Sequence, residues 1–345
     1  MRDQLVCRSH AVAKTVRVKV LGSAAGGGFP QWNCACHNCK GIRERTLNAS
    51  VRSQCQIAVS SNDADWFLLN ASPDLRAQIE NTPELHPRTC GRMTEISAAP
   101  SISRHSPVAG TVLTGGDLDQ VLGLLLLREL EPIRIYATGC VRRLLTEHNI
   151  FFHMLSREPW QSVWADIVPG QSFRLTTSDS SSYLLCEPVS LSGSFPAYVH
   201  GNGTAHLSAK EAILGLLLES SPGGGRLAYF PTVHEVEERL LELFDSCDLL
   251  LFDGTFWSDH ELVRVQRGVR TATEMGHVPI SGPHGSLNRL AKLRRPHKIF
   301  VHINNTNPIL DKDSLEHRQV ADAGWEVAED GWEFRLQRPN QVRCS

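Results

Sequence analysis

The sequence predicts an α/β fold in which helices cover packed β-sheets, and three features of the residue pattern support this prediction. The first part of the chain contains mainly strands: residues 16–22 alternate and are rich in valine, and residues 56–60 and 66–70 form a hairpin around a polar turn. Further along the chain, short buried strands alternate with helices. Neither an internal repeat nor a clear linker interrupts the 345 residues, so we expect one domain, residues 1–345.

The second part of the chain supplies the clearest strands and helices. Residues 110–114 and 248–253 are short apolar runs typical of buried strands, and the second run ends in a carboxylate. Residues 117–130 form an apolar stretch that predicts a buried helix. Residues 325–336 predict a closing hairpin.

Composition and charge exclude several classes of partner. The chain carries 35 Lys and Arg against 37 Asp and Glu, a formal net charge of -2, so we expect no nucleic-acid partner. The longest apolar run, residues 121–127, is too short to span a bilayer, and the N-terminus lacks the apolar core of a signal peptide. We therefore expect a cytoplasmic protein without membrane contact, with flexible tails at residues 1–15 and 337–345.

Three of the ten cysteines lie close together in the sequence. Cys34, Cys36 and Cys39 have the spacing C-x-C-x-x-C, and zinc favours four soft ligands in a tetrahedron. A disulfide framework is typical of small secreted domains, and free thiols packed this closely would oxidise readily. We therefore predict a structural zinc. Its fourth ligand is either the local His37 or a distant residue, which would fasten the N-terminal loop to the C-terminal half.

Polar residues near the ends of buried strands predict a second site. Singly, each has an ordinary structural explanation: Asp119 as a carboxylate at a helix N-terminus, Asp253 as a turn cap, and His277 as a loop histidine. Together they form a carboxylate-plus-imidazole set suited to a metal at a sheet edge. His302 ends another strand, where it could act as a general acid, a metal ligand or a partner that orients a ligand.

Five segments of the chain carry specific motifs: VLGSAAGGGFPQWNCACHNCKGIR, NASPDLRAQI, LLFDGTFW, MGHVPISGPHGSL and KIFVHINNTNPIL. Together they resemble the coenzyme PQQ synthesis protein B (PqqB) family of the metallo-β-lactamase fold superfamily, over nearly the whole chain. The resemblance implies a four-layer αββα sandwich with its site at one edge of the two sheets. It also implies the structural zinc on the three cysteines, with Asn305 as the fourth ligand or as a substrate contact.

The resemblance further implies one active-site metal instead of a pair. The superfamily signature H-x-H-x-D-H reads GGDLDQ at residues 115–120, so glycine and aspartate replace its first two histidines. The surviving ligand set is Asp119, Gln120, Asp253 and His277. Gln120 stands where the family normally has histidine, and an amide oxygen is a poorer ligand for iron or zinc than imidazole.

The function implied by the resemblance is the biosynthesis of pyrroloquinoline quinone (PQQ) from a glutamate–tyrosine pair. The associated reaction is oxygen-dependent hydroxylation of the tyrosine ring, for which one Fe²⁺ with open positions would bind O₂. His302 and Asp119 would act in catalysis, and Arg76 or the pair Asn304 and Asn305 would bind the carboxylates of the substrate.

The sequence leaves one alternative function open and argues against another. The alternative is a non-catalytic carrier that binds PQQ or its precursor for transport to the periplasm. A hydrolase such as a β-lactamase is not expected, because it usually needs two metals. The expected partners are the small-molecule precursor and other proteins of PQQ biosynthesis, and a homodimer is compatible with the sequence.

Overall fold

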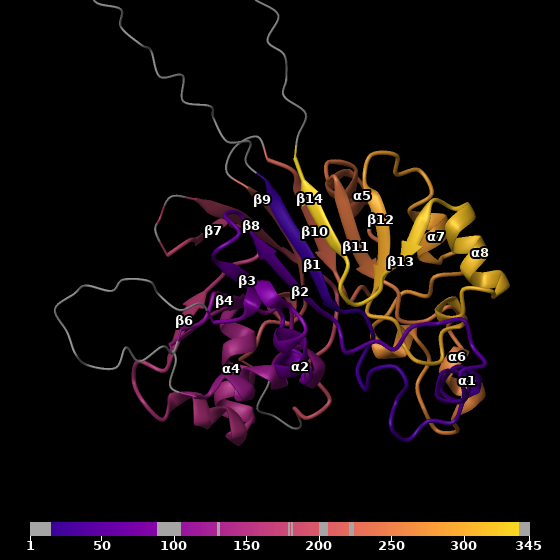
Figure 1. Ribbon diagram of the computed structural model, residues 1–345, viewed down its shortest axis with the longest axis horizontal. Coiled ribbons are helices and arrows are strands. Elements are labelled where there is room, and N and C mark those ends of the chain that lie inside the picture. Colours follow the sequence, from indigo (N-terminus) through magenta and orange to yellow (C-terminus); the bar gives the residue numbers. More distant parts are fainter. Residues whose placement is uncertain are drawn as a thin grey trace, which may run out of the picture.

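The computed structural model describes residues 15–87, 105–129, 132–178, 180, 182–199, 206–220 and 224–337. Within them the chain forms two packed β-sheets with helices on the outer faces (Figure 1). Most of the two expected tails lies outside the described residues. Thr15 and Gln337, at the inner ends of the tails, are joined by a hydrogen bond of 2.8 Å from Gln337 Nε2 to Thr15 Oγ1.

Each sheet contains seven strands in the described part of the chain. The first sheet has the order β14 (Glu333–Leu336), β1 (Val16–Gly22), β2 (Gln56–Ser60), β3 (Trp66–Leu69), β4 (Val108–Val112), β5 (Ile133–Ala137), β6 (Ser162–Asp166). The second has the order β13 (Trp325–Val327), β12 (His297–Val301), β11 (Leu249–Asp253), β10 (Arg226–Phe230), β9 (Leu214–Ser220), β8 (Tyr183–Ser190), β7 (Phe173–Thr176). Each half of the chain therefore builds one sheet, except that β14 returns to the first.

The two sheets pack face to face through alternate side chains of their strands. Val16, Val18 and Val20 of β1 are fully buried in the same cluster as Leu249 and Leu251 of β11. Strands β10 to β13 run parallel, and parallel strands covered on both faces read as continuous apolar runs. This explains why the run at residues 248–253 shows no polar alternation.

Helices cover the outer face of each sheet, which completes the expected four-layer αββα sandwich (Figure 1). Helices α2 and α4 lie on the first sheet, and α5, α7 and α8 lie on the second. No helix among the described residues is long and apolar enough to cross a bilayer. The α-helices are α1 (His37–Glu44), α2 (Leu75–Glu80), α3 (Leu118–Val121), α4 (Gly139–His148), α5 (Glu238–Asp245), α6 (Glu261–Val265), α7 (Ser286–Arg289) and α8 (Leu315–Asp322).

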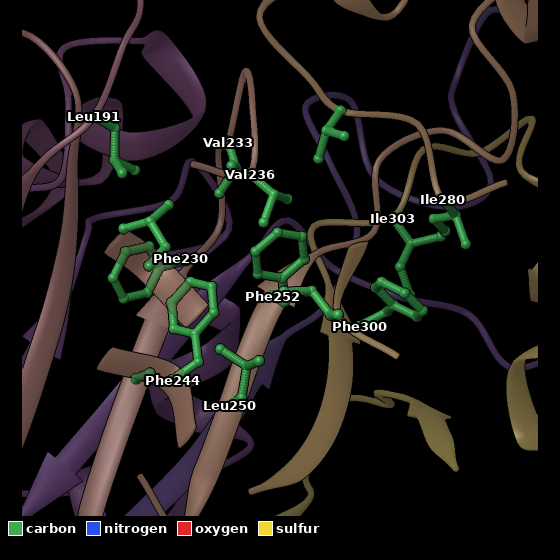
Figure 2. Packing of buried hydrophobic residues seen from close by; sticks show 14 of the residues in the cluster. Leu191, Phe230, Val233, Val236, Phe244, Leu250, Phe252, Ile280, Phe300 and Ile303 are labelled. Atoms are coloured by element: carbon green, nitrogen blue, oxygen red, sulfur yellow. The ribbon is translucent and has the colours of Figure 1, made fainter. Parts of the chain in front are cut away.

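Aromatic rings fill the layer between the second sheet and its helices (Figure 2). The ring of Phe244 in α5 meets Phe230 of β10 and Phe252 of β11 edge to face, with centroid distances of 4.8 and 5.8 Å. Phe300 of β12 stacks on Trp325 of β13 at 4.2 Å. Edge-to-face and offset-stacked pairs add to the stabilisation that burial provides, so this layer holds β10 to β13 in register.

Most of the expected strands are confirmed, and two expected elements are wrong. The expected helix over residues 117–130 is one turn of α-helix followed by a 3-10 helix, Leu122–Leu127. At Gly123 the backbone passes against the carbonyl groups of Ala71 and Ser72, where a β-carbon would collide, so a regular apolar helix does not fit. The expected hairpin over 325–336 is wrong because β13 and β14 lie in different sheets.

We expect Leu250→Ala to lower the free energy of unfolding by about 2–5 kcal/mol, because it opens a cavity under α5. Leu250 is fully buried in the layer of Figure 2. Leu315→Ala is the matched control, since this leucine is 66 % exposed and its truncation should change stability by less than about 0.5 kcal/mol. Urea unfolding of the two variants measures both values, and equal losses would contradict the packing described.

Candidate metal centres

The segment that follows β12 carries residues of both candidate sites. Its backbone pairs with the glycine-rich loop after β1: Ile303 N donates to Ser23 O at 2.9 Å, and Ala25 N donates to Ile303 O at 2.9 Å. His302 has a φ of +56°, in the left-handed region that costs a non-glycine residue about 1–3 kcal/mol. The pairing on both sides of Ile303 holds this conformation in place.

The three clustered cysteines converge at the start of α1. Cys34, Cys36 and Cys39 bring their sulfurs within 4.8 Å of one another. Burial raises the pKa of the Cys36 thiol to about 12. Burial also acts to raise the pKa of Cys34, but hydrogen bonds from the Cys36 N–H and from neighbouring side chains together hold that pKa below its usual value. A bound cation would displace the remaining protons, because thiolates are the metal-binding form.

A residue from the far end of the chain completes this cluster. The side-chain nitrogen of Asn305 lies 3.2 Å from Cys39 Sγ and 3.8 Å from Cys36 Sγ. Asn38 Nδ2 in turn donates to the carbonyl oxygen of Asn305 at 3.1 Å. His37 is exposed and does not join the group of three sulfurs. The geometry therefore favours the distant residue over the local histidine as the fourth group at this site.

Thr255 is the centre of the second site. Its Oγ1 lies 2.6 Å from Asp253 Oδ1, 3.1 Å from His277 Nδ1 and 2.8 Å from His302 Nδ1. The two imidazole rings stack at a centroid distance of 5.3 Å. One hydroxyl carries one proton, so it satisfies one acceptor at a time and couples the protonation of its neighbours.

Asp253 lies behind the imidazoles and is fully buried. Its Oδ1 accepts from Thr255 N at 3.0 Å, while Oδ2 accepts from Val233 N at 2.8 Å and lies 2.7 Å from His277 Nδ1. A carboxylate on one ring nitrogen fixes the ring and leaves the other nitrogen for a ligand. Burial acts to raise the pKa of Asp253, but the charges of His277 and His302 and the hydrogen bonds from His277 and Thr255 together keep the pKa below its usual value.

Asp119 and His302 form the second carboxylate–imidazole pair, with Asp119 Oδ2 2.9 Å from His302 Nε2. Burial opposes both charges, yet the hydrogen bond lowers the pKa of Asp119 and raises the pKa of His302. The neighbouring Asp117 has no such partner. Burial, reinforced by the charge of Asp119, raises the pKa of Asp117 to about 6.

The two ends of the Gln120 amide have different surroundings. Its Nε2 donates to Thr232 Oγ1 at 3.3 Å, and its Oε1 is buried without a hydrogen-bond partner among the described residues. The Oε1 atom lies against Gly115, where a β-carbon would collide with it. Glycine at the first signature position therefore makes room for glutamine at the last, and the orphaned oxygen is a free acceptor beside the second site.

A cavity of about 840 Å³ opens above this site, within the size range of ligand pockets. Asp119, Gln120, His277 and His302 line it, whereas Asp253 does not. The remaining walls are apolar or polar residues from several loops. They include Phe195, Tyr198, Phe256, Leu262, Gln266, Arg270, Met275 and Asn304.

Glu261, at the start of α6, holds the segment that follows β12 through hydrogen bonds. Its Oε1 accepts from Thr306 Oγ1 at 2.6 Å, and its Oε2 accepts from Trp257 N at 2.6 Å. Asn304 Nδ2 donates to the same threonine oxygen at 2.6 Å. Burial raises the pKa of Glu261 to about 7, although these hydrogen bonds oppose the shift.

The structure brings together the residues that the sequence singled out and adds others. Asp253, His277 and His302 meet around Thr255 and form one group of potential ligands, and Asp119 joins this group through His302. The sequence analysis missed Thr255, although it follows Asp253 by two residues in the DGT turn. Arg76, expected to bind substrate, is exposed on α2 and does not line the cavity.

The fold and site define a class of protein that the comparisons also identify. Residues 65–303 match the family model described as "Beta-lactamase superfamily domain". The two packed sheets with a candidate metal centre at the strand ends are the arrangement of the metallo-β-lactamase fold. The chain therefore has this fold, with the signature histidines reduced as described above.

Relatives that match nearly the whole chain show to which family of this class the chain belongs. The chain is 41 % identical to the coenzyme PQQ synthesis protein B of Pseudomonas entomophila (strain L48), over 92 % of its length and 99 % of the relative. It is 41 % identical to that of Azotobacter vinelandii (strain DJ), over 93 % and 100 %. The crystal structure of Zn²⁺-bound PqqB from Methylobacterium extorquens superposes with a TM-score of 0.81 at 37 % identity, covering 92 % and 99 %. The chain belongs to the PqqB family, whose role is PQQ biosynthesis.

Stability should depend on pH through Glu261. The folded chain holds this proton up to about pH 7, whereas the unfolded chain releases it near 4.5, so the group's contribution to stability falls as the pH rises through that window. Glu261→Gln keeps the neutral form at every pH. Between pH 5 and pH 8 the free energy of unfolding of this variant should therefore fall by up to about 3 kcal/mol less than that of the wild-type protein, as measured by urea unfolding.

The control for this prediction is Glu238→Gln, because the Glu238 side chain is 84 % exposed. It should keep the pH dependence of the wild-type protein. An unchanged pH dependence in Glu261→Gln as well would contradict a protonated Glu261.

Proposed function

We propose that this protein hydroxylates the tyrosine ring of the glutamate–tyrosine-derived precursor of PQQ, with one Fe²⁺ held at the second site. The observation that carries the proposal is the convergence of His277, His302 and Asp119 on the floor of a large cavity. Two imidazoles and one carboxylate with open positions are the ligand set of non-haem Fe²⁺ oxygenases. Glycine and aspartate at the first two signature positions remove the two imidazole donors of the usual second metal.

The donor set fits such a metal on two counts. Asp253 and Thr255 fix the rings of His277 and His302, as orienting groups do at metal sites. The unpartnered Oε1 of Gln120 supplies a further acceptor where the family normally has histidine. We assign Asp253 to orienting the imidazoles, because it is fully buried and does not line the cavity, and Asp119 to the carboxylate ligand.

When bound, the iron supplies O₂ activation, and the chain supplies the site for the ring. Phe195, Phe256 and Met275 give the cavity an apolar wall that suits an aromatic substrate. Tyr198 Oη donates to Gly116 O at 2.7 Å, so its ring is fixed at this wall. Each hydroxylation consumes O₂ and two electrons from an external reductant, and the second oxygen atom leaves as water.

The test is anaerobic reconstitution with Fe²⁺, followed by a Glu-Tyr dipeptide, a reductant and O₂. We expect hydroxylated product by mass spectrometry and about one iron per site. His302→Ala should lower both iron content and turnover at least about tenfold, because it removes one imidazole and its pairing with Asp119. His297→Ala is the control, since this histidine is exposed on β12 and pairs with Glu326.

A second function is favoured by one observation, the amide at position 120 in place of imidazole. A protein that carries PQQ or its precursor needs a cavity but no metal. Tight, iron-independent binding of PQQ together with no turnover of the dipeptide would support the carrier and overturn the hydroxylase.

We further propose that Cys34, Cys36 and Cys39 hold a structural zinc with Asn305 as the fourth group. The support is the convergence of three sulfurs with an amide from 266 residues away, as counted from Cys39. Zinc there would fasten the N-terminal loop to the segment that carries His302. The structural zinc would therefore stabilise the second site as well as the fold.

Cys36→Ser should abolish zinc at this site and lower the melting temperature, because one of the three thiolates is lost. Zinc content by mass spectrometry and thermal unfolding measure the two effects. Cys247→Ser is the matched control: this cysteine is buried under α5, where its sulfur lies 3.3 Å from Leu243 O, and a hydroxyl can make the same contact. Loss of zinc in both variants would contradict the assignment.

A further inference from the structure

One guanidinium lines the cavity among the residues that the structure describes. Arg270 follows α6, and the other charged or titratable lining groups are Asp117, Asp119, His277 and His302, apart from the phenol of Tyr198. The described part of the chain offers Arg270 no carboxylate within ion-pair distance, unlike Arg142, Arg239 and Arg295, which pair with acidic residues on the surface. Its position in the cavity therefore does not follow from a structural ion pair.

The backbone holds Arg270 at the wall. Its Nη1 donates to Glu274 O at 3.3 Å, and Thr271 N donates to Glu274 Oε2 at 2.8 Å. The same short segment leads to His277, so the guanidinium and an imidazole of the proposed metal site come from one loop. A guanidinium has five N–H donors, so the contact with Glu274 leaves donors for a ligand.

We propose that Arg270 forms an anion subsite that binds a carboxylate of the substrate while the tyrosine ring lies toward His277 and His302. A planar guanidinium binds a carboxylate through two parallel hydrogen bonds, which fixes orientation as well as affinity. Gln266, four residues earlier, also lines the cavity and adds a neutral amide donor to its wall. The inference rests on the proposed function for the identity of the substrate, and it places carboxylate recognition at Arg270, which lines the cavity, in place of Arg76, which does not.

The experiment measures binding by calorimetry to zinc-loaded protein, which avoids turnover. The probes are Glu-Tyr and Gln-Tyr amide, which keeps the N-terminal ammonium but has an amide in place of each carboxylate. We expect Arg270→Gln to weaken Glu-Tyr about tenfold or more, because it removes a charged hydrogen bond, and to leave Gln-Tyr amide unchanged. Arg270→Lys should fall between, since it keeps the charge but loses the planar pair of donors.

Arg267→Gln is the matched control, because Arg267 is exposed in the same loop and does not line the cavity. It should leave both affinities unchanged. Equal weakening of the two probes by Arg270→Gln would overturn the subsite, because the arginine would then act on the protein and not on a carboxylate. So would an unchanged affinity for Glu-Tyr.

PQQ, a tricarboxylate, separates the subsite from the proposed reaction. If the wild-type protein binds PQQ through Arg270 but does not bind Glu-Tyr, the anion subsite stands and the hydroxylase proposal falls. If neither ligand depends on Arg270, the subsite itself is overturned.

Discussion

The pairing of Ile303 with the loop after β1 is the constraint on which both candidate metal centres depend. Two backbone hydrogen bonds of 2.9 Å join residues that lie almost 280 positions apart in the chain. They fix His302, with its left-handed backbone, on one side of the pairing and Asn305 on the other. One short segment therefore supplies an imidazole to the cavity and an amide to the cysteine cluster. Displacing it would disturb both sites together.

Two buried residues behind the imidazoles, Asp253 and Thr255, organise the second site. Asp253 and Thr255 both contact the imidazoles, but only Thr255 reaches the surface of the cavity. Asp253 is fully buried behind it. Such buried polar groups are stable only when their hydrogen bonds are satisfied, and here both oxygens of Asp253 have partners. The exception is Gln120 Oε1, which lies in the space that Gly115 leaves free. Glycine at position 115 and glutamine at position 120 are therefore sterically complementary.

Local patterns predicted the strands well because burial on one or both faces leaves a direct record in the sequence. They failed where a distant part of the chain decided the outcome. The apolar stretch from residue 117 could not remain helical because Gly123 packs against the backbone of Ala71 and Ser72. The segments at Trp325 and Glu333 look like a hairpin, yet each is bound by a neighbour from a different sheet. No local signal distinguishes these cases.

The sequence by itself determined the chemistry that is available: three thiols at metal-binding spacing, carboxylates and histidines at strand ends, and a signature without its first two histidines. Motif resemblance also determined the fold and the family, because those segments are specific. Only the tertiary structure decided which of these side chains face the cavity. It placed His302 beside Asp119, moved Asp253 behind the imidazoles, and put Arg270 at the cavity wall. Roles depend on which atoms face the cavity, and that is set by contacts between residues far apart in the chain.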